Sequence, residues 1–205
     1  MRKMITVKIN GEERQYPQGA TYEDVANDYQ QEYENLIALA ARDGKIRELF
    51  KKLTRDCEVT FFTLKDDVGN KTYVRSATML FLKAVFDVYG REAAQSCRVE
   101  FAIGNGSYIS PKGKINVTEE NAAKIRNRMR ELVEAKTPFL KRSYSLDNAM
   151  ELFRKEGMKD KEKLFRYRRG SFVNIYEMDG YYDYYYGYML PNAGYVKWFD
   201  VIAYE

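Results

Sequence analysis

The sequence predicts an α+β protein in two parts, a first part over residues 1–65 and a second part over residues 66–205. Three observations predict this class. Short alternating segments and tight-turn dipeptides occupy the beginning of the chain, as in small β-rich units. Longer segments with helical periodicity follow them. The polar segment KDDVGNK, residues 65–71, interrupts both patterns and separates the two parts.

The first part begins with a predicted hairpin and a capped helix. Residues 4–9, MITVKI, alternate as a half-buried strand does, and Asn10-Gly11 is a strong signal for a two-residue turn. The segment ERQYP returns as the second strand. Thr21 is well placed to cap a helix over residues 22–33, with Asp24 three positions on in the reciprocal role of a capping box.

Two further segments complete the first part. Residues 36–53 are interpreted as a strand, an Asp-Gly-Lys turn and a short continuation, and residues 57–64, CEVTFFTL, as a closing strand. The resulting order is hairpin, helix, strand and strand. We therefore expect a β-grasp arrangement.

The second part mixes helices with hairpins. Gly90, Gly157 and Pro138 are positioned to end helices, and Thr118 and Ser145 to begin them. The predicted elements in order are a helix over 72–90, a hairpin over 97–111 around Gly104-Asn105-Gly106, a helix over 117–136, a strand over 139–145, a helix over 145–157 and alternating strands and turns over 172–205.

The composition limits the available chemistry. The chain contains no histidine, which removes the commonest general base, the commonest metal ligand and every Ser-His or Cys-His nucleophile pair. Only carboxylate, lysine or tyrosine chemistry remains. Cys57 and Cys97 fit neither a disulfide framework nor a metal-ligand spacing, and we expect small buried apolar residues at both positions. We expect no metal and no cofactor.

The net charge of +4 is unevenly distributed. Residues 141–169 contain ten Lys or Arg residues and five Asp or Glu residues, so this segment carries +5. It is interpreted either as a solvated helical surface or as a surface that contacts RNA phosphates. In the second interpretation the residues that contact RNA are Arg166, Arg168 and Arg169.

The sequence shows no sign of a membrane protein. No apolar run approaches the length of a transmembrane helix. The start, MRKMITVKING, lacks the apolar core and the cleavage site of a signal peptide. We therefore expect a cytoplasmic protein with no membrane partner.

Two segments carry a resemblance to a known family. The first part, from MITVKINGEERQYPQGATYEDVA to RDCEVTFFT, resembles a TGS domain, the β-grasp (ubiquitin-like) module at the N-terminus of threonyl-tRNA synthetases. The second part, through FAIGNGSYIS and residues 117–157, looks like the domain of these synthetases that removes mischarged amino acids from tRNA. The resemblance implies a TGS domain over 1–65 and a threonyl-tRNA synthetase editing-like α+β domain over 66–205.

The reactive motifs of that editing family are altered in this chain. In the family a helical H-x-x-x-H and a C-x-G-x-H before a P-x-T-G turn meet in one cleft. Alignment of RSATMLFLKAVFDVYG with the helix places Arg75 and Met79 at the two histidines. Alignment of YDYYYGYMLPNAGYVKWF with the second motif places Tyr185 at the cysteine and Met189 at the histidine. The turn skeleton is kept at Gly187, Pro191, Asn192 and Gly194.

A second resemblance suggests the context of the chain. The same two domains with altered motifs look like the N-terminal half of bacterial uridine kinase-like proteins (the phosphoribulokinase/uridine kinase family), in which an ATP-binding P-loop kinase domain follows. This chain contains no G-x-x-x-x-G-K-[ST] motif. The resemblance implies a non-catalytic binding or regulatory region whose partner is the kinase domain of the same polypeptide. The alternative is a tRNA-binding protein or a relative of the aminoacyl-tRNA deacylases.

The state of the cleft is left open by the sequence. Aromatic side chains either fill the vacated site as core or line a cleft that holds a nucleotide or an RNA end. A residual hydrolase would depend on Lys83, Asp183 or Tyr185. The candidate cleft residues are Arg75, Met79, Lys83, Tyr185, Tyr186, Met189 and Lys197.

Overall fold

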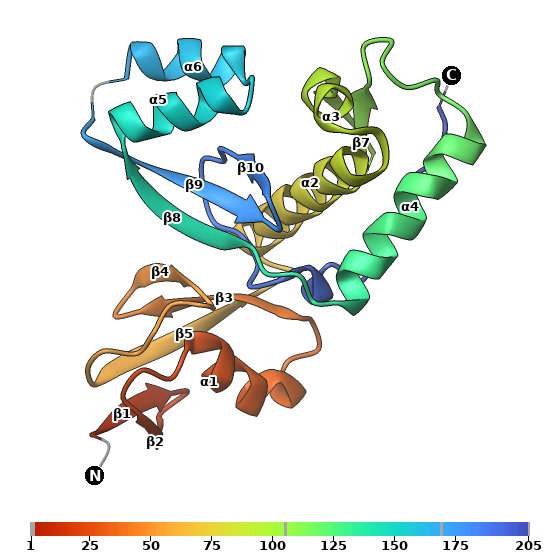
Figure 1. Ribbon diagram of the computed structural model, residues 1–205. Coiled ribbons are helices and arrows are strands. Elements are labelled where there is room, and N and C mark those ends of the chain that lie inside the picture. The colour runs from red at the N-terminus through yellow and green to blue at the C-terminus, as the bar shows by residue number, and fades with distance from the viewer. Residues whose placement is uncertain (1–2, 105, 169, 205) are drawn as a thin grey trace. The chain divides into compact units, whose positions relative to one another are not determined.

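The computed structural model of the chain describes residues 3–104, 106–168 and 170–204. Its strands and helices give the α+β class that the sequence predicts (Figure 1).

The chain divides into two compact units. The first unit comprises Met1–Ser76 together with Gly187–Pro191, and the second comprises Ala77–Tyr186 together with Asn192–Glu205. The boundary predicted between residues 65 and 66 lies just before helix α2, whereas the units divide inside that helix.

The first unit contains a five-stranded sheet, helix α1 and the first part of helix α2. The sheet order is β2-β1-β5-β3-β4, with β1 antiparallel to β2 and parallel to β5. This topology is compatible with the predicted β-grasp. The bounds are β1 Met4–Ile9, β2 Glu12–Pro17, α1 Tyr22–Tyr29, the 3-10 turn η1 Gln30–Glu32, β3 Ile37–Arg42, β4 Lys45–Glu48 and β5 Cys57–Thr63.

The core of the first unit follows from two sequence patterns. Residues Ile37 to Ala41 of β3 are all buried, as expected for an uninterrupted apolar run in an internal strand. Helix α1 buries one face, because its apolar residues recur at helical spacing. The buried residues of α1 are Tyr22, Val25, Ala26 and Tyr29.

Local turn and cap signals in the first unit are confirmed. Asn10 and Gly11 have φ angles of 51° and 88°, and a two-residue hairpin turn with positive φ at both positions favours this pair. Thr21 accepts a hydrogen bond from Asp24 N, and the Asp24 carboxylate accepts one from Thr21 N at 2.7 Å. The helix predicted over 22–33 is shorter than expected, since α1 ends at Tyr29.

Helix α2, Asp67–Tyr89, begins five residues before the predicted start at residue 72. A glycine normally weakens a helix, so the segment KDDVGNK is interpreted as a break from the sequence alone. The structure shows why Gly69 is tolerated: a Cβ atom added there would lie 2.0 Å from the carbonyl oxygen of Thr63. The close approach between the end of β5 and the first turn of α2 therefore requires glycine.

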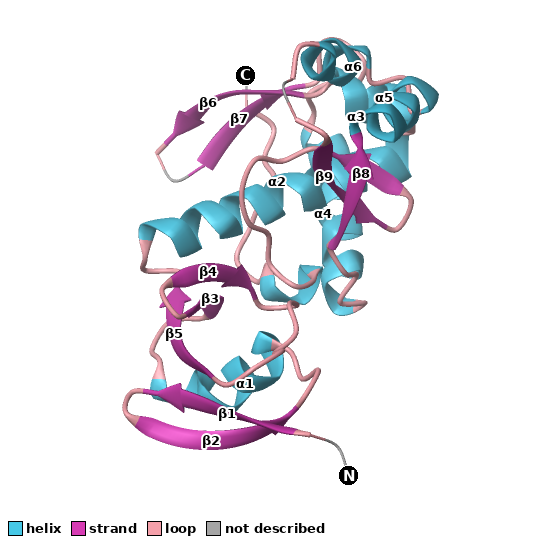
Figure 2. Ribbon diagram, turned by 90° about the vertical axis from the view of Figure 1, so that its left-hand side faces the viewer, coloured by secondary structure: helices cyan, strands magenta, loops and turns pink. Residues whose placement is uncertain are grey.

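The second unit contains a three-stranded antiparallel sheet, β10-β9-β8, and a separate hairpin, β6–β7, which Figure 2 shows as a two-stranded ribbon. Asn105, at the tip of this predicted hairpin, lies outside the described residues. The bounds are α3 Arg91–Ser96, β6 Arg98–Ile103, β7 Gly106–Ser110, α4 Glu119–Glu134, β8 Leu140–Ser145, α5 Leu146–Lys155, α6 Lys159–Arg166, β9 Phe172–Met178, β10 Tyr181–Asp183 and the 3-10 turn η2 Ala193–Tyr195.

The predicted caps of α4 and α5 are confirmed. The side chains of Thr118 and Ser145 each accept a hydrogen bond from the backbone N–H three residues further on. Helices α3 and α6 are not among the elements predicted from the sequence. Helix α6 packs on α5 through stacked rings of Phe153 and Phe165, whose centroids are 5.2 Å apart.

The prediction for the C-terminal segment is partly wrong. Strands β9 and β10 lie where alternation is expected, but the described residues 184–204 contain only the turn η2 and no further strand. The tyrosine-rich segment is thus mostly irregular backbone. Proline and two glycines in this segment disfavour a longer ladder.

Candidate functional site

The second unit contains a pocket of about 200 Å³ between helices and strands that are distant in the sequence. Helix α2 contributes Thr78, and the tyrosine-rich segment contributes Tyr185. The helix and the segment that the family motifs would occupy therefore share a cavity. The remaining lining residues are Leu82, Ala94, Gln95, Cys97, Arg98, Val99, Met158, Asp160, Lys161, Tyr181 and Asp183.

A buried ion pair lies in this pocket. The Lys161 ammonium is 2.5 Å from Asp183 Oδ1, which also accepts a hydrogen bond from Tyr184 N at 2.7 Å. The hydroxyl of Tyr181 lies 3.4 Å from the other carboxylate oxygen. Asp183 is only 5% exposed. Because the carboxylate is removed from water, its charge depends on these donors.

A second, more exposed ion pair lines the same pocket. Arg98 Nη1 on β6 is 3.4 Å from the Asp160 carboxylate on α6. The pocket thus presents two cations and two anions. This arrangement suits a small polar or zwitterionic group better than an apolar one.

Neither Cys97 nor Tyr181 is prepared to act as a nucleophile. Burial raises the pKa of the Cys97 thiol to about 11. Burial, with the nearby Asp183 carboxylate as the second cause, raises the pKa of Tyr181 well above its usual value. Both groups are therefore protonated at neutral pH, and the thiolate needed for nucleophilic attack is absent.

Lys83 belongs to a different network in the second unit. Its ammonium lies 2.8 Å from Asp87 Oδ1, and it donates to the Asp179 backbone carbonyl at 2.7 Å. Arg128 Nε donates to the other oxygen of Asp87 at 2.9 Å. The Lys83 side chain is 3% exposed. These contacts give Lys83 a structural role, and it does not line the 200 Å³ pocket.

Arg75 and Met189 both belong to the first unit. Arg75 Nη1 donates to the carbonyl oxygen of Tyr188 at 2.6 Å. Leu190 N donates to Ser76 Oγ at 2.9 Å, and Met189 is fully buried. The segment Gly187–Pro191 is therefore anchored within the first unit by hydrogen bonds.

Gly187 is needed for this anchoring. Its φ angle is +128°, and an added Cβ would lie 2.7 Å from Arg75 Cζ. The backbone at this glycine thus leaves space for the guanidinium that binds Tyr188.

The seven predicted cleft residues are dispersed. Among the described residues, Tyr185 lines the 200 Å³ pocket and its ring lies 6.5 Å from that of Tyr176. Met79 is fully buried, Tyr186 is 87% exposed and Lys197 is exposed. A ligand role for these residues stays a prediction.

The residues predicted to contact RNA differ in their surroundings. Arg166 is exposed. Arg168 donates to the Tyr184 hydroxyl at 2.7 Å, and its guanidinium lies 5.3 Å from the Phe165 ring centroid. Arg169 lies outside the described residues. Arg168 is thus occupied within the second unit.

Sequence reasoning misses the Lys161–Asp183 pair. Lys161 lies in the segment KDKEK, and a segment of this composition is ordinarily a solvated surface. Asp183 is considered in the sequence analysis only as a possible residue of a residual hydrolase. No spacing signal links two residues 22 positions apart when they approach through tertiary packing. The pocket therefore cannot be assembled from the sequence.

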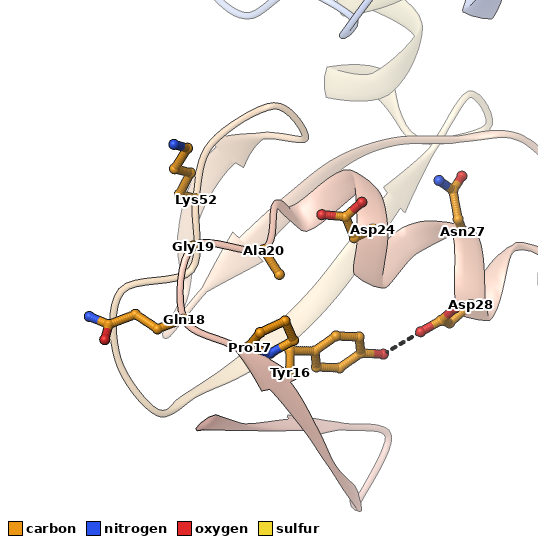
Figure 3. A pocket seen from close by; sticks show the side chains of 9 residues that line it. All are labelled: Tyr16, Pro17, Gln18, Gly19, Ala20, Asp24, Asn27, Asp28 and Lys52. Carbon is orange, nitrogen blue, oxygen red and sulfur yellow. Dashed lines mark hydrogen bonds between the residues drawn. The ribbon is translucent and has the colours of Figure 1, made fainter. Parts of the chain in front are cut away.

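The first unit has its own open cavity, of about 800 Å³, beside the start of α1 (Figure 3). The Tyr16 side chain points toward Asp28, and its hydroxyl donates to Asp28 Oδ2 at 2.9 Å. Lys52 and Gln18 point away from this pair. Asp24, also in the lining, is engaged in the capping box. The carboxylates of Asp24 and Asp28 form hydrogen bonds within the fold, and their negative charges disfavour a phosphate ligand here.

Metal-binding and membrane-spanning features are both missing from the described residues. In that part of the chain, no group of three or more Cys, Asp or Glu residues is arranged to hold a metal ion. Among the same residues, no helix is long and apolar enough to cross a bilayer.

Known proteins similar to this chain are threonine–tRNA ligases. The enzyme of Thermotoga neapolitana is 28% identical over 208 residues, covering 98% of this chain and 31% of the relative. That of Porphyromonas gingivalis strain W83 is 25% identical over 194 residues, covering 92% and 29%. That of Symbiobacterium thermophilum is 25% identical over 205 residues, covering 99% and 31%.

The similarity covers almost the entire chain. The chain itself spans about 31% of the length of the Thermotoga relative. No protein-family model matches it. The three relatives support the origin that the resemblance to synthetases implies, whereas the nucleoside kinase context stays a prediction.

Proposed function

We propose that this chain binds tRNA and does not hydrolyse aminoacyl-tRNA through an imidazole or a thiolate. The observation that carries the proposal is the similarity to threonine–tRNA ligases over 98% of the chain. The relatives are named as ligases of threonine and tRNA. A related chain without histidine can keep a surface that binds tRNA, but it has no imidazole group for hydrolysis.

The pocket of the second unit is the proposed site for the 3′ end of the tRNA. Lys161 and Arg98 offer cations to phosphate or carboxylate groups, and Asp183 offers an anion to an amino group. An esterified amino acid carries an ammonium and no carboxylate, so its amino group would pair with Asp183 while Lys161 pairs with a phosphate of the tRNA. Binding is thereby supported without any proton-transfer group.

A binding measurement tests the proposal. Fluorescence anisotropy with labelled threonine tRNA should show saturable binding by the full chain, and Arg98→Gln should weaken it several-fold by removing a cation from the pocket. Lys124→Gln is the matched control, because Lys124 lies on α4 and is 51% exposed and ion-paired. Absence of wild-type binding, or equal loss in both variants, contradicts the proposal.

The non-hydrolytic part needs a separate assay. Threonine tRNA carrying a wrong amino acid should lose it no faster in the presence of the protein than in buffer. Turnover that disappears in Tyr185→Phe would instead establish a deacylase that uses the tyrosine hydroxyl.

A further inference from the structure

Helix α6 presents a basic face to solvent. Phe165 is fully buried against α5, and the residues on the opposite side of the helix are exposed. At 3.6 residues per turn, positions i, i+4, i+7 and i+8 share one side. These positions are Lys159, Lys163, Arg166 and Tyr167, which together are called the α6 face.

The charge of this region is only partly neutralised by ion pairs. Residues 159–168 contain five Lys or Arg residues and two Asp or Glu residues, a net charge of +3. Asp160 pairs with Arg98 at 3.4 Å. Glu162 pairs with Arg154 at 3.1 Å and, at the longer distance of 3.9 Å, with Arg166. Within the described part of the chain, neither Lys159 nor Lys163 forms an ion pair. The α6 face therefore favours a polyanion.

Tyr167 distinguishes this face from an ordinary solvated helix. Its side chain is 85% exposed, whereas Phe165, two residues earlier, is fully buried. An aromatic ring this exposed contributes little to the core. A ring beside a row of cations is the combination that binds unpaired bases by stacking while the cations follow the phosphates.

We infer that the α6 face binds single-stranded RNA, with Tyr167 stacking on one base and Lys159, Lys163 and Arg166 contacting the phosphates. The inference rests on the proposed tRNA binding and names a contact surface for the unpaired part of that ligand. Helix α6 ends at Arg166 and is about 12 Å long, with Tyr167 as its C-cap, so the face covers only a few nucleotides.

Unpaired RNA is favoured over a duplex by the exposed ring. A base inside a duplex is already stacked on both sides, so a tyrosine ring on the surface gains stacking only from an unpaired base. The neutral ring adds nothing to phosphate contact.

The test measures binding of the full chain to a labelled single-stranded RNA of ten nucleotides and to a hairpin without unpaired ends. Lys159→Gln/Lys163→Gln/Arg166→Gln should weaken binding to the single strand at least tenfold and lower the slope of log K against log salt by about two. Tyr167→Ala should weaken single-strand binding about tenfold and hairpin binding little, and Tyr167→Phe should restore it.

A matched triple variant controls for total charge. Lys112, Lys114 and Lys124 are similarly exposed, but each is ion-paired with a glutamate. Replacing these three lysines by glutamine removes the same charge and should change binding less than threefold. Equal weakening by both triple variants, or an unchanged affinity in Tyr167→Ala, overturns the inference.

Two outcomes separate this inference from the proposed function. Wild-type protein that binds neither tRNA nor the oligonucleotide overturns both. Wild-type protein that binds threonine tRNA with unchanged affinity in the α6 variants overturns only the α6 face. Vesicles with anionic lipid are included as a competitor, and a face that binds them and not RNA also overturns the assignment.

Discussion

The Lys161 ammonium lies 2.5 Å from the Asp183 carboxylate, and this pair joins helix α6 to the end of strand β10 across 22 positions of the chain. The Asp183 side chain is 7% exposed and that of Lys161 is 22% exposed. The Asp183 carboxylate is therefore stabilised by this ammonium together with the Tyr184 N–H, and removing Lys161 leaves it in a poorly solvated position without a cation.

We expect Lys161→Met to lower the free energy of unfolding by about 3 kcal/mol, because the Asp183 carboxylate would stay buried without its cation. The double variant Lys161→Met/Asp183→Asn should recover most of this loss, since the amide oxygen still accepts a hydrogen bond from Tyr184 N. Urea unfolding followed by tyrosine and tryptophan fluorescence measures both values.

Lys124→Met is the matched control for that experiment. Lys124 pairs with Glu120 at 2.7 Å on the exposed side of α4, where water screens the charges. It should change the stability little. A loss in Lys161→Met no larger than in Lys124→Met would show that the buried pair contributes no more than a surface pair.

We expect Gly187→Ala to destabilise the protein by about 3 kcal/mol. The positive φ angle of +128° accounts for about 1 kcal/mol, and displacement of the Arg75 guanidinium from Tyr188 accounts for the rest. Thermal and urea unfolding measure the change. Combining it with Arg75→Ala should cost less than the sum of the two single changes, because both remove the same hydrogen bond.

Gly180→Ala separates the two contributions. Gly180 has a φ angle of +78°, but an added Cβ there meets no atom within 4 Å. This variant should therefore lose only about 1 kcal/mol. Equal losses at residues 180 and 187 would mean that the contact with Arg75 is unimportant.

The raised pKa of the Cys97 thiol predicts that the protein loses stability at alkaline pH. Its pKa is raised by burial from 9.0 to about 11, so the folded state disfavours the thiolate. The stabilisation is complete below pH 9, decreases as the pH rises and is lost above about 11, because the unfolded chain releases this proton first. Unfolding measured in urea at about pH 8 and about pH 10.5 should show the decrease.

Cys97→Ala provides the reference for this pH profile. Tyrosine and lysine side chains also titrate at alkaline pH, so the quantity to compare is the difference in unfolding free energy between the wild-type protein and the variant. The wild-type protein should lose more stability than the variant between the two pH values. Parallel profiles would show that the thiol ionises as readily in the folded protein as in the unfolded chain.

Local signals in the sequence predict much of the fold. The Asn10-Gly11 turn, the Thr21–Asp24 capping box and the caps at Thr118 and Ser145 depend on residues within three positions of one another, and all are found. The rules for turns and caps describe such short-range hydrogen bonds directly.

Long-range packing explains what the sequence does not reveal. Gly69 suggests a break because the approach of Thr63 cannot be seen in the local sequence. Helix α6 is hidden in a charged segment whose only buried ring is Phe165. The candidate pocket depends on Lys161 and Asp183, which packing brings together from separate elements, whereas motif alignment directs attention to Arg75 and Met189.

The membership of residues 187–191 in the first unit has a practical consequence for anyone who truncates this protein. A fragment that ends at Ser76 would lack the segment that donates to Ser76 Oγ and to the Glu48 carboxylate, and would uncover the buried Glu48. A fragment that starts at residue 77 would carry that apolar segment with its acceptors missing. No single cut yields two intact halves, so deletion mapping of the proposed tRNA binding would mislead and point substitutions are required.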